Sequence, residues 1–145
     1  MQNSWQYYPV TWDFYNNFDN SDDRKLCFYP LYVGVDGLTY EQPPTLGASP
    51  PPGLSYMTDI ATKKYANSTG SITYYAGNSV DIFRYADILL SRAEALNELN
   101  GPTAEDIDLI NQVKARSHAT PLVLAGFTQS SLRDAILQER GWEFF

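Results

Sequence analysis

Residues 81–145 constrain the fold most, because apolar side chains recur there at helical spacing in three consecutive segments. In residues 81–99 the apolar positions cover a broad arc of the helical wheel and leave only a narrow polar stripe. The arc comprises Ile82, Tyr85, Ala86, Ile88, Leu89, Leu90, Ala93, Ala95, Leu96 and Leu99. Because so wide an apolar face needs neighbours on two sides, we predict a stack of helices.

The next two segments complete this predicted helical region. The second helix should begin after Gly101-Pro102, with Thr103 as its N-cap and Asp106 three residues later, and end near Ser117. Since the connection is short, the first two helices should form an antiparallel hairpin. A third helix, from about Ser130 to residue 145, should pack on this hairpin. Its apolar face carries Leu132, Ala135, Ile136 and Trp142.

Two carboxylates interrupt the apolar face of the third helix. Glu139 and Glu143 lie four residues apart, where like charges repel each other, and burial raises the cost. They therefore need cations from elsewhere in the fold. Arg92 interrupts the apolar arc of the first helix, and Arg116 lies at the end of the second. We predict an internal ion-pair clamp in which Glu139 or Glu143 bonds to Arg92 or Arg116.

Residues 1–80 have a different character, rich in Tyr, Pro, Gly, Asn and Ser and poor in helical periods. We expect irregular loops there, with short β segments at residues 31–35 and 71–75. The Pro/Gly-rich residues 42–53 cannot form a helix or a central strand and should be a surface loop. The predicted fold is thus mainly α, with a loop-rich region 1–80 followed by a helical region 81–145.

Three sequence blocks resemble a known family. Residues 84–98 read RYADILLSRAEALNE, residues 110–116 read INQVKAR, and residues 135–143 read AILQERGWE. These blocks look like the consecutive signature blocks of the SusD/RagB family, and TWDFYNNFD at residues 11–19 resembles the family's middle region. The resemblance implies a tetratricopeptide-like fold and non-catalytic, cofactor-free glycan binding. It also implies attachment by a lipid anchor to the outer membrane of Bacteroidetes-type bacteria, beside a SusC-like TonB-dependent transporter.

The sequence departs from the family pattern at two places, and the second affects the expected extent of the protein. Lys114 stands where the family more often has arginine, and the sequence ends at Phe144-Phe145, where the family continues. We therefore expect this chain to be a piece of a longer SusD/RagB-like domain. The lipid anchor would lie outside it, because the residues before Cys27 do not form a lipobox.

Composition excludes several other functions. A net charge of −7, with 10 basic residues scattered among 17 acidic ones, argues against nucleic acid as a partner. A single cysteine and a single histidine, His118, predict no disulfide and no metal site. Residues 19–23 space oxygen ligands as calcium loops do. Arg24 and Pro30, however, replace the glycine and glutamate that such a loop requires.

The candidates for glycan contact are aromatic residues near the start of the chain. Trp5, Tyr7, Tyr8 and Trp12 could stack on sugar rings while neighbouring amide side chains bond to hydroxyls. The alternative is that these rings are core residues that pin an irregular segment. Two other functions stay open. A helical-repeat protein-interaction module would use the same helices, and a glycoside hydrolase would need a carboxylate pair beside an aromatic cleft.

Overall fold

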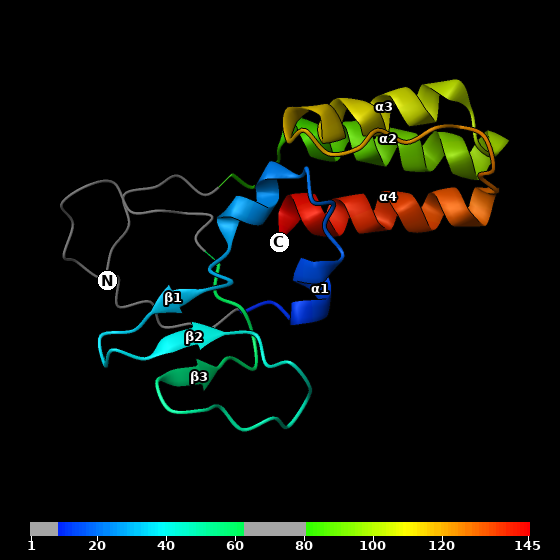
Figure 1. Cartoon of the computed structure of the whole chain (residues 1–145). Helices are drawn as coiled ribbons and strands as arrows, with labels where there is room; N and C mark the ends of the chain where they lie inside the picture. Colours follow the sequence, from blue (N-terminus) through cyan, green and yellow to red (C-terminus); the bar gives the residue numbers. More distant parts are fainter. Residues whose placement is uncertain (1–8, 63–80) are drawn as a thin grey trace. The chain divides into compact units, whose positions relative to one another are not determined.

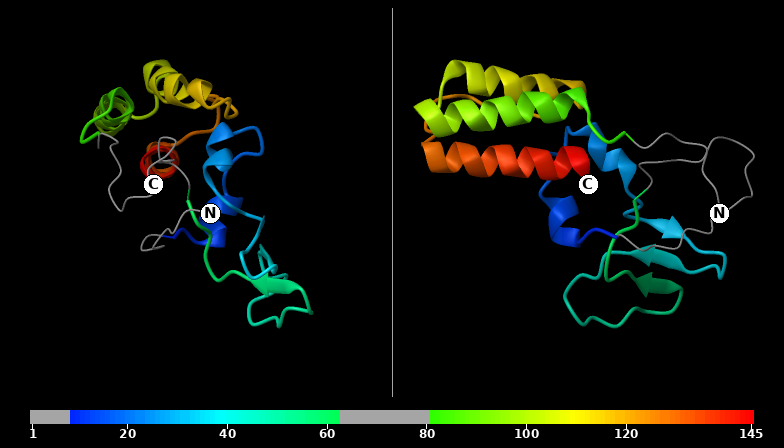
Figure 2. Two further views of the ribbon diagram at one scale, coloured as in Figure 1. Left: turned by 90° about the vertical axis from the view of Figure 1, so that its left-hand side faces the viewer. Right: turned by 180° about the vertical axis from the view of Figure 1, so that it is seen from behind.

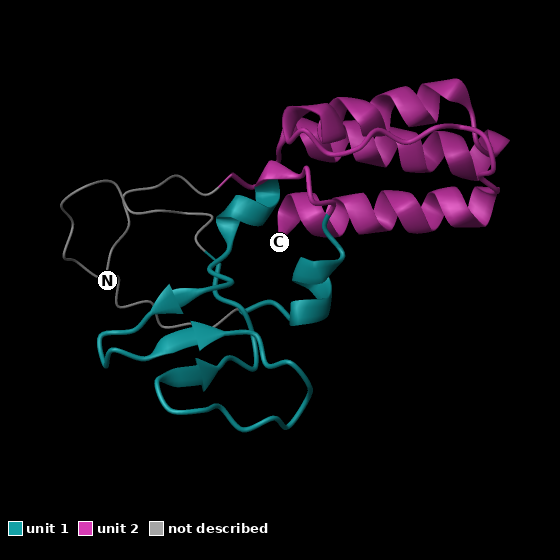
Figure 3. Ribbon diagram, viewed as in Figure 1, with its two compact units in different colours: residues 1–18, 24–78 teal, residues 19–23, 79–145 magenta. Residues whose placement is uncertain are grey.

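The computed structural model describes residues 9–62 and 81–145, which belong to two compact units (Figure 1, Figure 3). Unit 1 comprises residues 1–18 and 24–78, and unit 2 comprises residues 19–23 and 79–145. The described chain is mainly helical with a few short strands, so the predicted fold class is confirmed. Each unit is described separately below.

Unit 2 is built on three long helices. Helix α2 spans Tyr85–Asn100, α3 spans Ala104–Arg116 and α4 spans Gln129–Phe144. A short turn makes α2 and α3 an antiparallel hairpin, and α4 packs against both, antiparallel to α2 (Figure 1). Seen almost along the axis of α4, the three helices lie at the corners of a triangle (Figure 2). The predicted hairpin with a third helix packed on it is confirmed.

The core of unit 2 is apolar and draws on all three helices. Leu90, Ile110, Leu132 and Ile136 are completely buried at its centre. Ala86, Leu89, Ala93, Ile107, Leu109 and Val113 surround them. These positions recur every three or four residues, so the helical period of the sequence explains why this face of each helix is buried.

The outer side of α2 differs from the prediction. The helix begins at Tyr85 rather than Asp81, and Ile82, Tyr85, Ile88 and Leu99 of the predicted arc are 84%, 72%, 60% and 81% exposed. Ile82 lies before the first residue of the helix. Tyr85, Ile88 and Leu99 lie on one side of the apolar arc, and within the described residues α3 and α4 cover only the other side, around Leu90.

Capping residues define the start of α3. The Thr103 hydroxyl accepts from the Asp106 N–H at 3.4 Å, and Asp106 Oδ2 accepts from the Thr103 N–H at 2.7 Å and from its hydroxyl at 2.9 Å. This reciprocal capping box satisfies backbone donors that the first turn of a helix leaves free. Asp106 is completely buried, so its oxygen cannot exchange these partners for water.

Removal of this cap should be costly. We expect Thr103→Ala to lower the free energy of unfolding by about 1–2 kcal/mol, measured by urea denaturation. Thr128 caps α4 through an equivalent box with Ser131, but there both residues are exposed. Because water can replace that cap, Thr128→Ala should cost less than about 1 kcal/mol. A cost at Thr128 equal to that at Thr103 would contradict this burial argument.

The described part of unit 1 contains a small sheet and a short helix. Strands β1 (Tyr32–Val33), β2 (Thr39–Glu41) and β3 (Leu54–Tyr56) lie in the order β1-β2-β3, the first pair antiparallel and the second parallel. Strand β1 lies inside the predicted segment 31–35, and residues 42–53 form a mostly exposed loop between β2 and β3. The predicted strand at 71–75 lies outside the described residues.

Two short helices of the first half were not predicted. Helix α1 spans Trp12–Asn16, where the Thr11 hydroxyl accepts from the Phe14 N–H, and the 3-10 helix η1 spans Asp23–Cys27. Each has only five residues, too few to produce a helical period in the sequence. In unit 1, Phe28 is almost completely buried and meets Phe18 and Tyr15 edge to face. Aromatic packing therefore supplies much of this small core.

Candidate functional site

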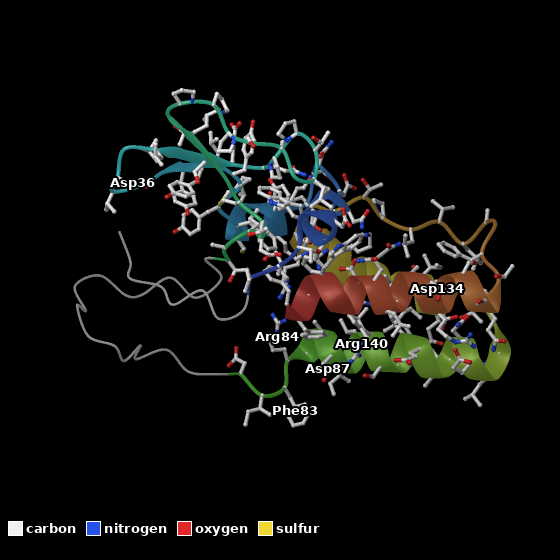
Figure 4. The ribbon with its side chains drawn as sticks, turned by 90° about the horizontal axis from the view of Figure 1, so that it is seen from below. Asp36, Phe83, Arg84, Asp87, Asp134 and Arg140 are labelled. Atoms are coloured by element: carbon white, nitrogen blue, oxygen red, sulfur yellow. The ribbon has the colours of Figure 1, made fainter. Side chains whose placement is uncertain are left out.

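The buried carboxylate of Glu143 contacts an arginine at the start of α2 and another at the end of α3. The Glu143 side chain is inaccessible to solvent, and its Oε1 lies 2.9 Å from Arg84 Nη1 and 2.5 Å from Arg116 Nη2. Arg84 Nη2 also donates to the Glu143 backbone oxygen, at 2.5 Å. Figure 4 shows Arg84 at the start of α2, beside Asp87 and Arg140 and next to the end of α4. The carboxylate therefore holds two guanidinium groups in place.

The second inward-facing carboxylate has a different partner. Glu139 Oε2 lies 3.4 Å from Lys114 Nζ, and both side chains are buried. The Lys114 ammonium also lies 5.5 Å from the centre of the Trp142 ring, within range of a cation–π contact. Charge pairing and the aromatic face together offset the desolvation of Lys114 and Glu139.

The structure assembles part of the predicted clamp and replaces the rest. Glu139 and Glu143 face inward, and Arg116 bonds to Glu143. Arg92 does not join them, because its guanidinium pairs with Glu105 at the surface. Arg84 and Lys114 take the place expected for Arg92. Lys114 follows Ile110 by one helical turn, so the sequence already indicated that Lys114 lies on the buried face of α3.

A surface hollow lies beside this network. It has a volume of about 340 Å³ and lies in unit 2 between the first turn of α2 and the end of α3. Its lining residues are Arg84, Tyr85, Ala86, Leu89, Gln112, Val113 and Arg116. The hollow thus combines an apolar floor with an exposed phenol ring, an amide and two guanidinium groups. Small-molecule sites generally combine apolar surface with a few placed polar donors. Sequence reasoning did not identify Tyr85 or Gln112.

The predicted glycan contacts lie elsewhere in the chain. Trp5, Tyr7 and Tyr8 fall outside the described residues. Trp12 is only 8% exposed, and its indole N–H donates to the Met57 backbone oxygen at 2.8 Å. The structure therefore places Trp12 in the core of unit 1 and not on a binding surface, because its ring is covered and its polar atom is already bonded.

Acidic residues of the segment 19–23 accept hydrogen bonds from other groups of the protein. Asp19 accepts from the backbone N–H groups of Ser21 and Thr120, at 3.1 and 3.0 Å. Together with the Thr120 hydroxyl, these donors hold the pKa of Asp19 well below its usual range. Asp23 Oδ2 lies 2.6 Å from Nδ1 of the exposed His118. Among the described residues, no group of His, Cys, Asp and Glu side chains could hold a metal ion.

Comparison with known proteins identifies the family. The family model described as the SusD family matches residues 7–145. The chain belongs to the SusD family. No solved structure matches it significantly.

Three curated proteins of Formosa agariphila resemble this SusD-family chain. It is 47% identical to SusD-like protein P25 over 90% of the chain and 22% of the relative. It is 42% identical to SusD-like protein P38 over 59% of the chain and 18% of the relative. It is 31% identical to SusD-like protein P2 over 53% of the chain and 16% of the relative. The SusD-family chain therefore spans about a fifth of the length of these relatives. None of its described helices is long and apolar enough to cross a membrane.

Proposed function

We propose that the protein captures glycans at the bacterial outer-membrane surface and delivers them unchanged to a SusC-like TonB-dependent transporter. The observation that carries this proposal is the match to the SusD family over residues 7–145. Binding without catalysis and without a cofactor is the role that the family implies. Attachment to the membrane would use a lipid anchor, as the family implies.

The glycan contacts proposed in the first half are Trp5, Tyr7 and Tyr8. Their flat rings suit the apolar faces of pyranose sugars, and the neighbouring Asn3 and Gln6 offer hydrogen bonds to hydroxyls. Trp12 no longer belongs to this proposed set, since its ring is covered.

A polysaccharide panel tests the proposal. Affinity electrophoresis of the full-length protein should reveal at least one retarding polysaccharide, and calorimetry should give its affinity. Trp5→Ala should weaken that affinity about tenfold, equivalent to about 1.4 kcal/mol, without a change in melting temperature. Under this proposal the Trp5 ring contacts the ligand, so its loss removes ligand contact and not core packing.

Trp12→Phe is the matched control. It should lower the melting temperature, because the indole hydrogen bond to Met57 is worth about 1 kcal/mol, and leave glycan affinity unchanged. If Trp5→Ala lowers the melting temperature and not the affinity, Trp5 is a core residue. Failure to bind any polysaccharide would contradict glycan capture itself.

A protein-interaction module is the second candidate, favoured by the exposed apolar row Tyr85, Ile88 and Leu99 on α2. The three residues lie on one side of α2, with Arg92 and Ala95 between Ile88 and Leu99, and such a face can pack against a partner helix. Under this hypothesis Ile88→Asp should abolish binding of a protein partner, detected by co-purification from the native outer membrane. If a transporter still co-purifies with the Ile88→Asp variant, the result favours glycan capture.

A further inference from the structure

The hollow between α2 and α3 has an excess of positive charge. Two guanidinium groups, those of Arg84 and Arg116, share the single carboxylate of Glu143. Asp87, in the first turn of α2, pairs with Arg140 Nη2 at 2.7 Å. Among the described residues, the lining of the hollow thus includes two arginines and no acid.

Both guanidinium groups are held in fixed positions. Arg84 bonds to the side chain and backbone of Glu143, and its guanidinium lies 4.8 Å from the centre of the Phe144 ring. Arg116 bonds to both oxygens of the buried Glu143 carboxylate through Nη2 alone. Its side chain is 58% exposed and lines the hollow, so within the described part of the chain its Nε and Nη1 groups can donate to a ligand there.

The first turn of α2 adds backbone donors at the same place. Tyr85 and Ala86 open this 16-residue helix and line the hollow. The N-cap residue, Arg84, makes no side-chain hydrogen bond to the first turn. The opening N–H groups of a helix have no partner inside it, and the helix dipole favours negative charge there. The guanidinium groups and the helix end thus act on the same space.

From this arrangement we infer that the hollow binds the acidic substituent of a glycan, a carboxylate or a sulfate ester. Arg116 and the first turn of α2 hold the anion, while the exposed Tyr85 ring and the Gln112 amide contact the sugar that carries it. The inference rests on the proposed glycan capture and specifies its ligand class. The net charge of −7 does not oppose it, because charges beyond about 8 Å are screened at physiological ionic strength.

The test uses small probes on the whole chain at constant ionic strength. Galacturonate, its methyl ester and inorganic sulfate are titrated while NMR follows the backbone amides of Tyr85 and Ala86. The methyl ester keeps the sugar ring but removes the charge. Galacturonate or sulfate should shift these amides and the ester should not. A response to galacturonate alone identifies a carboxylate as the ligand, and a response to sulfate alone identifies a sulfate.

Two substitutions locate the binding charge. Arg116→Gln should weaken anion binding at least about tenfold, because it removes charge-assisted donors. Arg92→Gln is the matched control, since Arg92 is similarly exposed, at 61%, and is likewise paired with one glutamate, Glu105. It changes the net charge equally and should alter binding less than twofold.

Three results would overturn the inference: no shift with either anion, equal shifts with the methyl ester, or equal losses in the two variants. If the protein binds a polysaccharide of the panel and any of these results is obtained, glycan capture stands but the hollow does not bind the acidic substituent. A negative panel with the expected amide shifts would overturn glycan capture but retain the anion specificity of the hollow.

Discussion

Replacement of Arg84 and Arg116 together by methionine should lower the free energy of unfolding by about 3–5 kcal/mol. The double substitution removes both guanidinium groups from the buried Glu143 carboxylate, and the loss of charge partners by a buried carboxylate is costly. Methionine retains the apolar stem of each arginine, so the measured loss reports mainly on charge and hydrogen bonding. Urea denaturation followed by far-UV circular dichroism measures this change.

The matched control is the double variant Arg92→Met/Arg133→Met. These arginines also pair with glutamates, Glu105 and Glu98, but both pairs are exposed. Exposed ion pairs are worth about 0–1 kcal/mol each, so the control should lose far less stability. Addition of Glu143→Leu to the first double variant should restore most of its stability, since an apolar replacement of the whole buried set is often neutral. Equal losses in the two double variants would contradict the role assigned to Glu143.

Truncation of the core between α2 and α3 should have an effect of similar size. Ile110 is completely buried among side chains of all three helices of unit 2. Ile110→Ala should lower the free energy of unfolding by about 2–5 kcal/mol, since it removes buried apolar surface and leaves a cavity. The same urea titration measures the change.

Ile88 offers a control of the same residue type on the neighbouring helix. It is 60% exposed, so Ile88→Ala should change stability by less than about 0.5 kcal/mol. If Ile88→Ala were as damaging as Ile110→Ala, the exposed face of α2 would be packed against something in solution. The comparison therefore tests the burial pattern of the hairpin and not only the loss of methyl groups.

Local periodicity was sufficient to predict the helical region. The spacing of apolar residues in 81–145 predicted three helices, and the short Gly101-Pro102 connection predicted the antiparallel hairpin. Thr103 and Asp106 were identified as a cap because capping depends on residues only three apart. The inward positions of Glu139 and Glu143 followed from the same helical wheel.

The partners of those carboxylates were not predictable in this way. Arg84 and Glu143 are 59 residues apart in sequence, and their contact depends on α4 running antiparallel to α2. The wheel favoured Arg92 because it interrupts an apolar arc, but the packed helices place that arginine beside Glu105 at the surface. The hollow likewise combines Tyr85 with Gln112 and Arg116, residues that only the α2–α3 packing brings together.

Sequence by itself thus determined the family, the helices of residues 81–145 and the direction in which Glu139 and Glu143 face. These features depend on side chains within a few residues of each other or on recognisable blocks. Tertiary structure decided which cations reach the carboxylates, which part of the α2 arc stays exposed, and that Trp12 is covered. Each of these depends on a neighbour distant in the chain, as in the bond from Trp12 to Met57 across 45 residues. Helical period specifies the face on which a side chain lies, whereas burial and ion pairing depend on what packs against that face.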